Sequence, residues 1–298
     1  NCVATTQPLA AQAGLAMLAN GGNAVDAAVA TAIALTVVEP VMNGIGSDAF
    51  AIVAADGGLH GLNASGRAPS AWTAERFAGQ ATMPLRGWDS VTVPGAVSAW
   101  AALHQRFGRL PFEALFKPAI HYARYGFLVS PVIAAYWQGQ VEMLRDLPGF
   151  AEAFMPNGRA PKAGEVFRCP EQARTLEEIA ATKGETFYRG RIALVIAAAA
   201  KRGGGVMSVD DLAAHQADWV EPIGVDFRGY RVHEIPPNGQ GVAALIALGI
   251  LERLDLDPGA IDSAAMQHLA IEATKLGMAD VKAHVSDPDT MLVRTEAL

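Results

Sequence analysis

The most constraining feature of this 298-residue chain is a helix-like run that is apolar on nearly every side. Residues 24–38 read AVDAAVATAIALTVV, and Asp26 is the only charged residue among them. Gly21-Gly22 precede the run, Asn23 is a preferred N-terminal cap, and Pro40 disfavours helix in the residue before it. Because a helix that is apolar all round is found buried, the sequence predicts a buried helix over residues 24–38.

Length and composition allow a large core and exclude several classes of protein. Apolar residues make up 51% and charged residues 18% of the chain, which is too apolar for disorder and too mixed for a membrane protein. No apolar run reaches the roughly 18–20 residues that span a bilayer. Thirty acidic against 23 basic residues give a net charge of −7, so nucleic acids and anionic membranes are poor candidate partners.

Helices and hairpins are predicted along the whole chain. Asp56-Gly57-Gly58, between residues 49–55 and 59–64, and Arg228-Gly229, within residues 223–235, are typical of hairpin turns. Helices are expected at residues 8–20, 24–38, 95–107, 111–126, 171–182, 186–200, 240–254 and about 263–283. Residues 70–90 and 145–170 are expected to be irregular. The mixture predicts an α+β fold with a mainly antiparallel sheet and no linker that marks a domain boundary.

Self-contained catalytic motifs are absent from the sequence. It lacks HExxH, GxSxG, SxxK and GxxxxGK(S/T), which mark zinc proteases, serine nucleophiles and phosphate-binding loops. The seven histidines are scattered singly, so no metal site is predicted, and no cofactor is expected. Residues 44–49 have a GxGxxA shape, but they precede a predicted strand instead of following one. The residues alone therefore indicate a mixed helix-and-strand domain without a catalytic machine of its own.

Short sequence blocks spread over the chain occur together in the order of one known family. The first block is residues 12–30, QAGLAMLANGGNAVDAAVA. Further blocks follow at residues 39–46, 68–69, 93–97, 110–127, 187–193, 210–213, 228–237, 279–280 and 286–289. This series resembles the γ-glutamyltranspeptidase family. Since the blocks cover essentially the whole chain, the resemblance is far more specific than any single motif.

The resemblance implies an N-terminal-nucleophile (Ntn) hydrolase, a four-layer αββα sandwich made as one precursor that cuts itself into a large and a small subunit. It implies that the nucleophile is the new N-terminal threonine of the small subunit, with its own α-amine as the base, and that the oxyanion hole also lies there. Residues 1–298 end soon after Asp287-Pro288-Asp289, before the family's Thr-Thr-His-type block.

We therefore expect residues 1–298 to be the large subunit, one domain completed by the small-subunit chain. No catalytic residue is expected in this chain, and Asn1 has neither a hydroxyl nor a thiol with which to attack. A dimer of heterodimers is left open. The start of the chain shows no signal peptide, so we expect a cytoplasmic location, or a periplasmic or secreted one if a signal peptide was removed.

One segment departs from the family pattern where the acyl group of the substrate is expected to bind. In relatives that act on γ-glutamyl compounds, the arginine of an Arg-Glu-x-Ala-Pro pattern binds the α-carboxylate of the substrate. Aligned on Ala68-Pro69, that arginine position holds Ser65, the glutamate position holds Gly66, and an arginine stands two residues later, at Arg67. Two residues along a strand move a side chain by about 6.6 Å on the same face. We predict that Arg67 binds a substrate carboxylate at a different depth; a surface ion pair is the alternative.

Two neighbours of Arg67 complete the candidate site, and two segments outside it also match family blocks. Period-two alternation predicts that Asn63 and Ser65 share the strand face of Arg67 and add hydrogen bonds to the pocket; the alternative is that both are ordinary strand-end residues. Residues 44–48 are expected to shape the interior of the protein. Asn238-Gly239-Gln240-Gly241 stands where relatives carry a Pro-Ser-Ser-Gly-Gly-type block. It is either a helix N-terminus that receives an anion or a capped turn at the subunit interface.

The resulting hypothesis is the large subunit of an enzyme that hydrolyses or transfers γ-glutamyl amides. Its substrate is a small amide that bears a carboxylate, and the reaction passes through an acyl-enzyme on the partner's threonine. An amidohydrolase for another acyl group, of the oxamate amidohydrolase or cephalosporin acylase type, is an equally credible alternative because of Ser65-Gly66-Arg67. An inactive binding or scaffold homologue is the third possibility.

Overall fold

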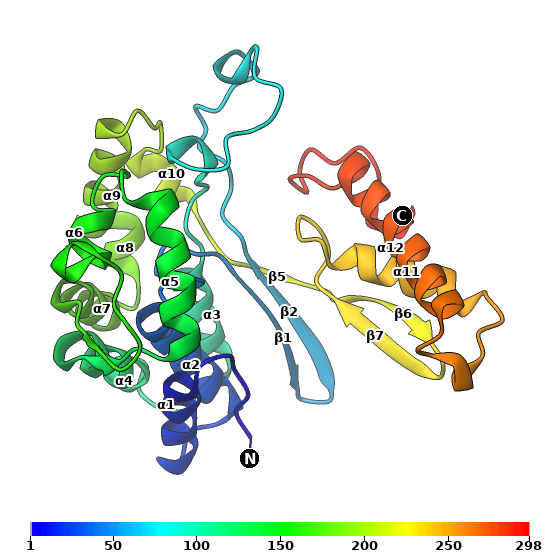
Figure 1. Ribbon diagram of the computed structural model, residues 1–298, viewed down its shortest axis with the longest axis horizontal. Helices are drawn as coiled ribbons and strands as arrows, with labels where there is room; N and C mark the ends of the chain where they lie inside the picture. The colour runs from blue at the N-terminus through cyan, green and yellow to red at the C-terminus, as the bar shows by residue number, and fades with distance from the viewer. Residues whose placement is uncertain (1, 298) are drawn as a thin grey trace. The chain divides into compact units, whose positions relative to one another are not determined.

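The chain folds into two compact units, which the computed structural model describes over residues 2–297 (Figure 1). Unit 1 contains the residues up to 48 and residues 66–216, and unit 2 contains residues 49–65 and those from 217 onward. Asn1 and Leu298 lie outside the described residues, and so does the prediction about Asn1. The prediction that residues 1–298 form one domain together with a second chain stays a prediction.

Unit 1 is built around α2 (Ala24–Val38), which begins and ends where the sequence predicts. Three helices pack against it: α1 (Pro8–Ala19), α3 (Ala96–Phe107) and α4 (Phe112–Tyr125). Ten of the fifteen residues of α2 are buried. The prediction of a buried helix is therefore confirmed, apart from one stripe along the helix that is described below.

The single charge of α2 is buried without loss of its hydrogen bonds. The Asp26 carboxylate is fully buried and accepts the N–H groups of Asn23, Arg109 and Leu110 at 2.9–3.2 Å. The Asn23 side chain in turn accepts the N–H groups of Val25 and Asp26, which completes a capping box. Asp26 thus joins the start of α2 to the loop that leads into α4.

The remaining elements of unit 1 surround this group. They are α5 (Pro131–Leu144), α6 (Phe150–Phe154), α7 (Pro170–Thr182), α8 (Glu185–Arg189), α9 (Arg191–Arg202), α10 (Val209–Ala214) and the short pair β3 (Phe127–Leu128) and β4 (Val166–Phe167). The helix predicted at residues 186–200 is divided at Gly190, where a Cβ would lie 2.7 Å from the Cα of Thr186. α5, α6 and α10 were not expected from the sequence, and α6 lies within residues 145–170, which were expected to be irregular.

Unit 2 contains two hairpins and two helices. β1 (Ala49–Ala55) and β2 (Gly58–Ala64) form the first hairpin, and β5 (Asp218–Val220) extends it in the order β1-β2-β5. β6 (Ile223–Phe227) and β7 (Tyr230–Glu234) form the second, and α11 (Gly241–Glu252) packs on both of its strands. α12 (Ala264–His284) packs on α11 around the buried residues Ala247, Leu251, Leu256 and Ala273.

The sheets agree with the class predicted from the sequence. Every strand pair among the described residues is antiparallel, and both predicted hairpins turn where expected, at Asp56-Gly57 and at Arg228-Gly229. The α+β class is therefore confirmed. Within residues 2–297, none of the helices combines the length and the apolar character needed to cross a bilayer.

Candidate substrate-binding site

The residues predicted to bind substrate lie at and beyond the C-terminal end of β2, but they do not share a strand face. Asn63 is on β2, pairs with Asp218 of β5 in the ladder and is only 9% exposed. β2 ends at Ala64, so Ser65 and Arg67 follow it in irregular chain. The prediction that Arg67 shares a strand face with Asn63 and Ser65 is wrong. The pairing of β2 with β1 ends at Ala64 and its pairing with β5 ends at Asn63, so the chain beyond them is not held in the pleated form of a strand.

Asn63 and Ser65 are brought together with Asn238 in a closed ring of three hydrogen bonds. Nδ2 of Asn63 donates to Oδ1 of Asn238 at 2.9 Å, and Nδ2 of Asn238 donates to Oγ of Ser65 at 2.8 Å. The backbone N–H of Ser65 closes the ring by donating to Oδ1 of Asn63 at 2.9 Å. Asn238 comes from the turn before α11, and all three residues belong to unit 2. The ring therefore ties the end of β2 to a turn that lies 175 residues further along the chain.

The ring consists of Asn63, Ser65 and Asn238, whereas Arg67 belongs to unit 1, to which the chain returns after Ser65. The residue is exposed, and its backbone carbonyl accepts the N–H of Val93 at 3.0 Å. At Gly66 a Cβ would lie 1.5 Å from the Val93 carbonyl oxygen, so only glycine permits this close approach. Glycine at position 66 is thus required by the backbone of this chain.

The segment that follows Arg67 is held by the carboxylate of Asp211, a contact that was not predicted from the sequence. Asp211 Oδ1 accepts the N–H of Ser70 at 2.9 Å, and Oδ2 accepts the N–H and the hydroxyl of Ser208 at 2.8 Å. Burial opposes the ionisation of Asp211, but these donors outweigh it and hold the pKa of the carboxyl below its ordinary value. The pattern Ser208-x-x-Asp211 is a capping box and was a usable signal for both α10 and this anchor.

A Ser–His pair near the start of α3 has the wrong polarity for a nucleophile. Ser98 Oγ lies 2.9 Å from Nε2 of His215, but its hydroxyl donates to the carbonyl of Gly95 at 2.7 Å. Since a hydroxyl has one hydrogen, Nε2 of His215 must donate to Oγ and cannot remove a proton from it. In this arrangement the pair links the first turn of α3 to His215 at the end of α10.

The loop of residues 44–48 supports the same helix end. Ser47 Oγ accepts the N–H of Gly44 at 3.0 Å, and the Ser47 carbonyl accepts the N–H groups of Gly95 and Ala96 at 3.0 and 2.8 Å. The expectation that this loop shapes the interior thus takes a specific form: its carbonyl satisfies two N–H groups at the N-terminus of α3.

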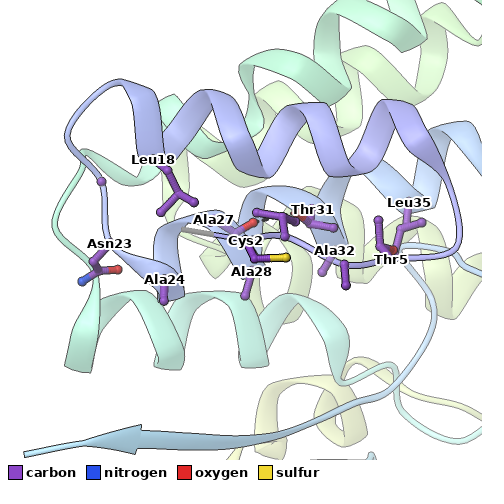
Figure 2. A pocket seen from close by; sticks show the side chains of 13 residues that line it. Cys2, Thr5, Leu18, Asn23, Ala24, Ala27, Ala28, Thr31, Ala32 and Leu35 are labelled. Atoms are coloured by element: carbon purple, nitrogen blue, oxygen red, sulfur yellow. Dashed lines mark hydrogen bonds between the residues drawn. The ribbon is translucent and has the colours of Figure 1, made fainter.

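A pocket of about 500 Å³ lies in unit 1 between the N-terminal segment and the helices α1 and α2 (Figure 2). Its floor is a stripe of α2 on which Ala24 and Ala28 are exposed and Ala32 and Leu35 are half-buried. Cys2, an exposed free thiol, is the only ionisable side chain in its lining. The pocket contains no cation that would pair with a carboxylate and none of the predicted site residues.

The described part of the chain contains no cluster of side chains that could bind a metal ion. Within residues 2–297, no three His, Cys, Asp or Glu side chains gather closely enough to hold an ion. In unit 2 the described residues at the end of β2 carry hydrogen-bonding groups, and in unit 1 the described residue Arg67 carries a charge.

Comparison with known proteins gives consistent results. Residues 10–298 match the family model described as gamma-glutamyltranspeptidase. The chain is 38% identical over 283 residues to the glutathione hydrolase-like YwrD proenzyme of Bacillus subtilis, covering 94% of this chain and 54% of that protein. It is 37% identical over 297 residues to the oxamate amidohydrolase proenzyme of Klebsiella pneumoniae, covering 97% of this chain and 56% of that protein.

A solved structure is similar over nearly the whole chain. The cephalosporin acylase of Bacillus halodurans is 48% identical and superposes with a TM-score of 0.93, covering 97% of this chain and 55% of that one. The chain thus spans about half the length of the curated relatives it matches. With a family model that matches residues 10–298, and with relatives this similar, the chain belongs to the γ-glutamyltranspeptidase family.

Proposed function

We propose that residues 1–298 form the large subunit of an Ntn amidohydrolase with a four-layer αββα fold, completed by a second chain cut from the same precursor. The two curated relatives described above are named as proenzymes, and this chain covers 54% and 56% of their lengths. The surface of each unit supports a covering partner. The stripe of α2 leaves small apolar side chains open, and Phe50 and Ile52 of the edge strand β1 are 43% and 39% exposed.

The proposed reaction is cleavage of an amide through an acyl-enzyme on the N-terminal threonine of the second chain. The threonine hydroxyl attacks the amide carbon, its proton passes by way of the α-amine to the leaving nitrogen, and an amine or ammonia departs. Water then attacks the ester and releases the acid, or an acceptor amine takes the acyl group. The polarity of the Ser98–His215 pair supports the assignment of the nucleophile to the other chain.

The observation that carries the substrate class is the segment Ser65-Gly66-Arg67. We propose that Arg67 binds the carboxylate of a small amide and that Asn63 and Ser65 belong to the same acyl-binding region. The main candidate is a γ-glutamyl amide. The second candidate, a different acyl group such as that of oxamate, is supported by Gly66, because the backbone of Val93 leaves no room there for the glutamate that accompanies the family's arginine.

Two substrates assayed side by side on the complete two-chain protein separate these candidates. One assay follows a γ-glutamyl anilide with and without a dipeptide acceptor, and the other follows ammonia release from oxamate. Anilide cleavage that speeds up with the acceptor identifies a transpeptidase. Ammonia release with little anilide cleavage identifies the second candidate. If neither amide turns over while the precursor stays uncut, the enzyme proposal is wrong and a scaffold role replaces it.

Replacement of Arg67 tests the carboxylate contact. Loss of a charge-assisted hydrogen bond costs about 1.5–3 kcal/mol, so Arg67→Ala should lower kcat/KM for the better substrate roughly 10-fold or more. Arg67→Lys keeps the positive charge but not the bidentate guanidinium, so its kcat/KM should lie between those of the original protein and Arg67→Ala. An unchanged kcat/KM in Arg67→Ala would remove Arg67 from the site.

A further inference from the structure

The direction of every hydrogen bond in the Asn63–Ser65–Asn238 ring is fixed by one backbone group. The N–H of Ser65 can only donate, so the atom of Asn63 that it contacts must be the amide oxygen. Nδ2 of Asn63 then faces Asn238 and can only donate, which makes the Asn238 acceptor its oxygen. Nδ2 of Asn238 is left to donate to Oγ of Ser65. The ring therefore has a single polarity.

This polarity determines what the Ser65 hydroxyl does. Its oxygen already accepts from Asn238, so its own hydrogen points away from that amide. Within the described residues, the hydrogen bonds of Ser65 are those to Asn63 and Asn238, and the hydroxyl donates in neither. Ser65 as a residue is half-buried. The ring leaves one oriented donor at the end of β2.

We propose that Asn238 is a positioning residue that keeps the Ser65 hydroxyl hydrogen free to donate to the acyl part of the substrate. This inference rests on the proposed function, because Ser65 occupies the position of the family's carboxylate-binding arginine when the chain is aligned on Ala68-Pro69. The acceptor is an oxygen of the carboxylate or carbonyl of the substrate. Asn238 does not touch the substrate. It acts by donating a hydrogen bond to Oγ, so that the Ser65 hydroxyl does not donate to Asn238.

Replacement of Asn238 by aspartate separates positioning from simple support of the fold. An aspartate accepts from Nδ2 of Asn63 and also from the Ser65 hydroxyl, so the ring stays closed. The bond to Ser65 is reversed, however, and the hydroxyl hydrogen is taken from the substrate. We expect Asn238→Asp to keep the melting temperature of the complete protein within about 2 °C and to raise KM about 10-fold with little change in kcat.

Controls account for charge and for loss of the ring. Gln240 is exposed, lies two residues further along the same turn and makes no capping hydrogen bond. Gln240→Glu adds the same charge nearby and should leave KM within twofold. Ser65→Ala removes the donor and should raise KM as much as Asn238→Asp does. In the Ser65→Ala background, Asn238→Asp should then have little further effect, because the two changes remove the same hydrogen bond.

The outcomes distinguish this inference from the proposed function. If Ser65→Ala raises KM while Asn238→Asp leaves it unchanged, the positioning role of Asn238 is wrong and the contact of Ser65 with substrate stands. If Ser65→Ala leaves KM unchanged, both statements about Ser65 are wrong. If Gln240→Glu raises KM as much as Asn238→Asp, the effect is one of charge and the inference is overturned.

Discussion

Two long helices of this chain are used in opposite ways. α2 buries ten of its fifteen residues together with its only charge, whereas α12 buries two of its twenty-one, Ala273 and Gly277. Ile33 of α2 is fully buried, but Ile271 of α12 is 57% exposed. Unit 1 therefore closes a core from its own helices, whereas unit 2 depends on its hairpins and on the contact between α11 and α12.

One isoleucine-to-alanine substitution in each helix should have very different effects on stability. Ile33→Ala removes a packed side chain and should lower the free energy of unfolding by about 2–5 kcal/mol. Ile271→Ala changes an exposed position and should alter it by no more than about 0.5 kcal/mol. Urea unfolding of the complete protein measures both values. A loss of more than about 1 kcal/mol at Ile271 would show that the assembled protein buries this face of α12.

The contact between α11 and α12 gives the second test. At Gly277 a Cβ would lie 2.6 Å from the backbone oxygen of Ala243, so the helices touch through their main chains. Gly277→Ala should therefore cost about 1–3 kcal/mol by forcing them apart. Gly139 of α5 is the matched control, because nothing lies within 4 Å of its added Cβ. Gly139→Ala should stabilise the protein by up to about 1 kcal/mol; equal losses at both glycines would contradict the close approach.

Alkaline pH should affect a polar cluster of unit 1 but not the hydrogen-bonded ring of unit 2. Burial raises the pKa of Tyr188 in unit 1 to about 12, and its hydroxyl donates to the Pro94 carbonyl and accepts the N–H of Ser98. Because the unfolded tyrosine ionises near pH 10, the stability that Tyr188 provides is complete below pH 10 and is lost as pH rises toward 12. The ring of Asn63, Ser65 and Asn238 in unit 2 contains no titrating side chain.

Tyr188→Phe isolates this effect. Near neutral pH it should cost about 1–2 kcal/mol, since a buried carbonyl and a backbone N–H each lose their partner. The variant should also lose less stability than the original protein between pH 8 and pH 11, because it has no phenol to ionise. Parallel urea titrations at these two pH values check both parts, and identical pH slopes would refute the assignment.

Local signals in the sequence predict much of the fold. Asn23 with Asp26 fixes the start of α2, and Asp56-Gly57 fixes the first hairpin, because these residues act on their immediate neighbours. The same kind of signal was available for α5, where the Ser130 side chain caps the helix, and it was overlooked. The sequence therefore contains a local signal for α5 in addition to those for the helices that were predicted.

The candidate site depends on distant pairings, which no local pattern reveals. Arg67 was assigned to a strand face, but β2 ends at Ala64 because its neighbouring strands supply no partner beyond that point. The partnership of Asn63 with Asn238 joins residues 175 apart. Gly66 is required by its approach to Val93, which only the folded backbone shows. The candidate residues could thus be chosen from the sequence, whereas the contacts they make could not be predicted from it.

The central claim is that residues 1–298 bind the acyl group while a second chain carries the nucleophile. The most direct measurement is the intact mass of every chain of the complete protein after brief reaction with an activated ester of its better substrate. We expect one acyl increment on the second chain, at an N-terminal threonine, and none on residues 1–298. A stoichiometric acyl increment on residues 1–298, or a protein that contains no second chain, would contradict it.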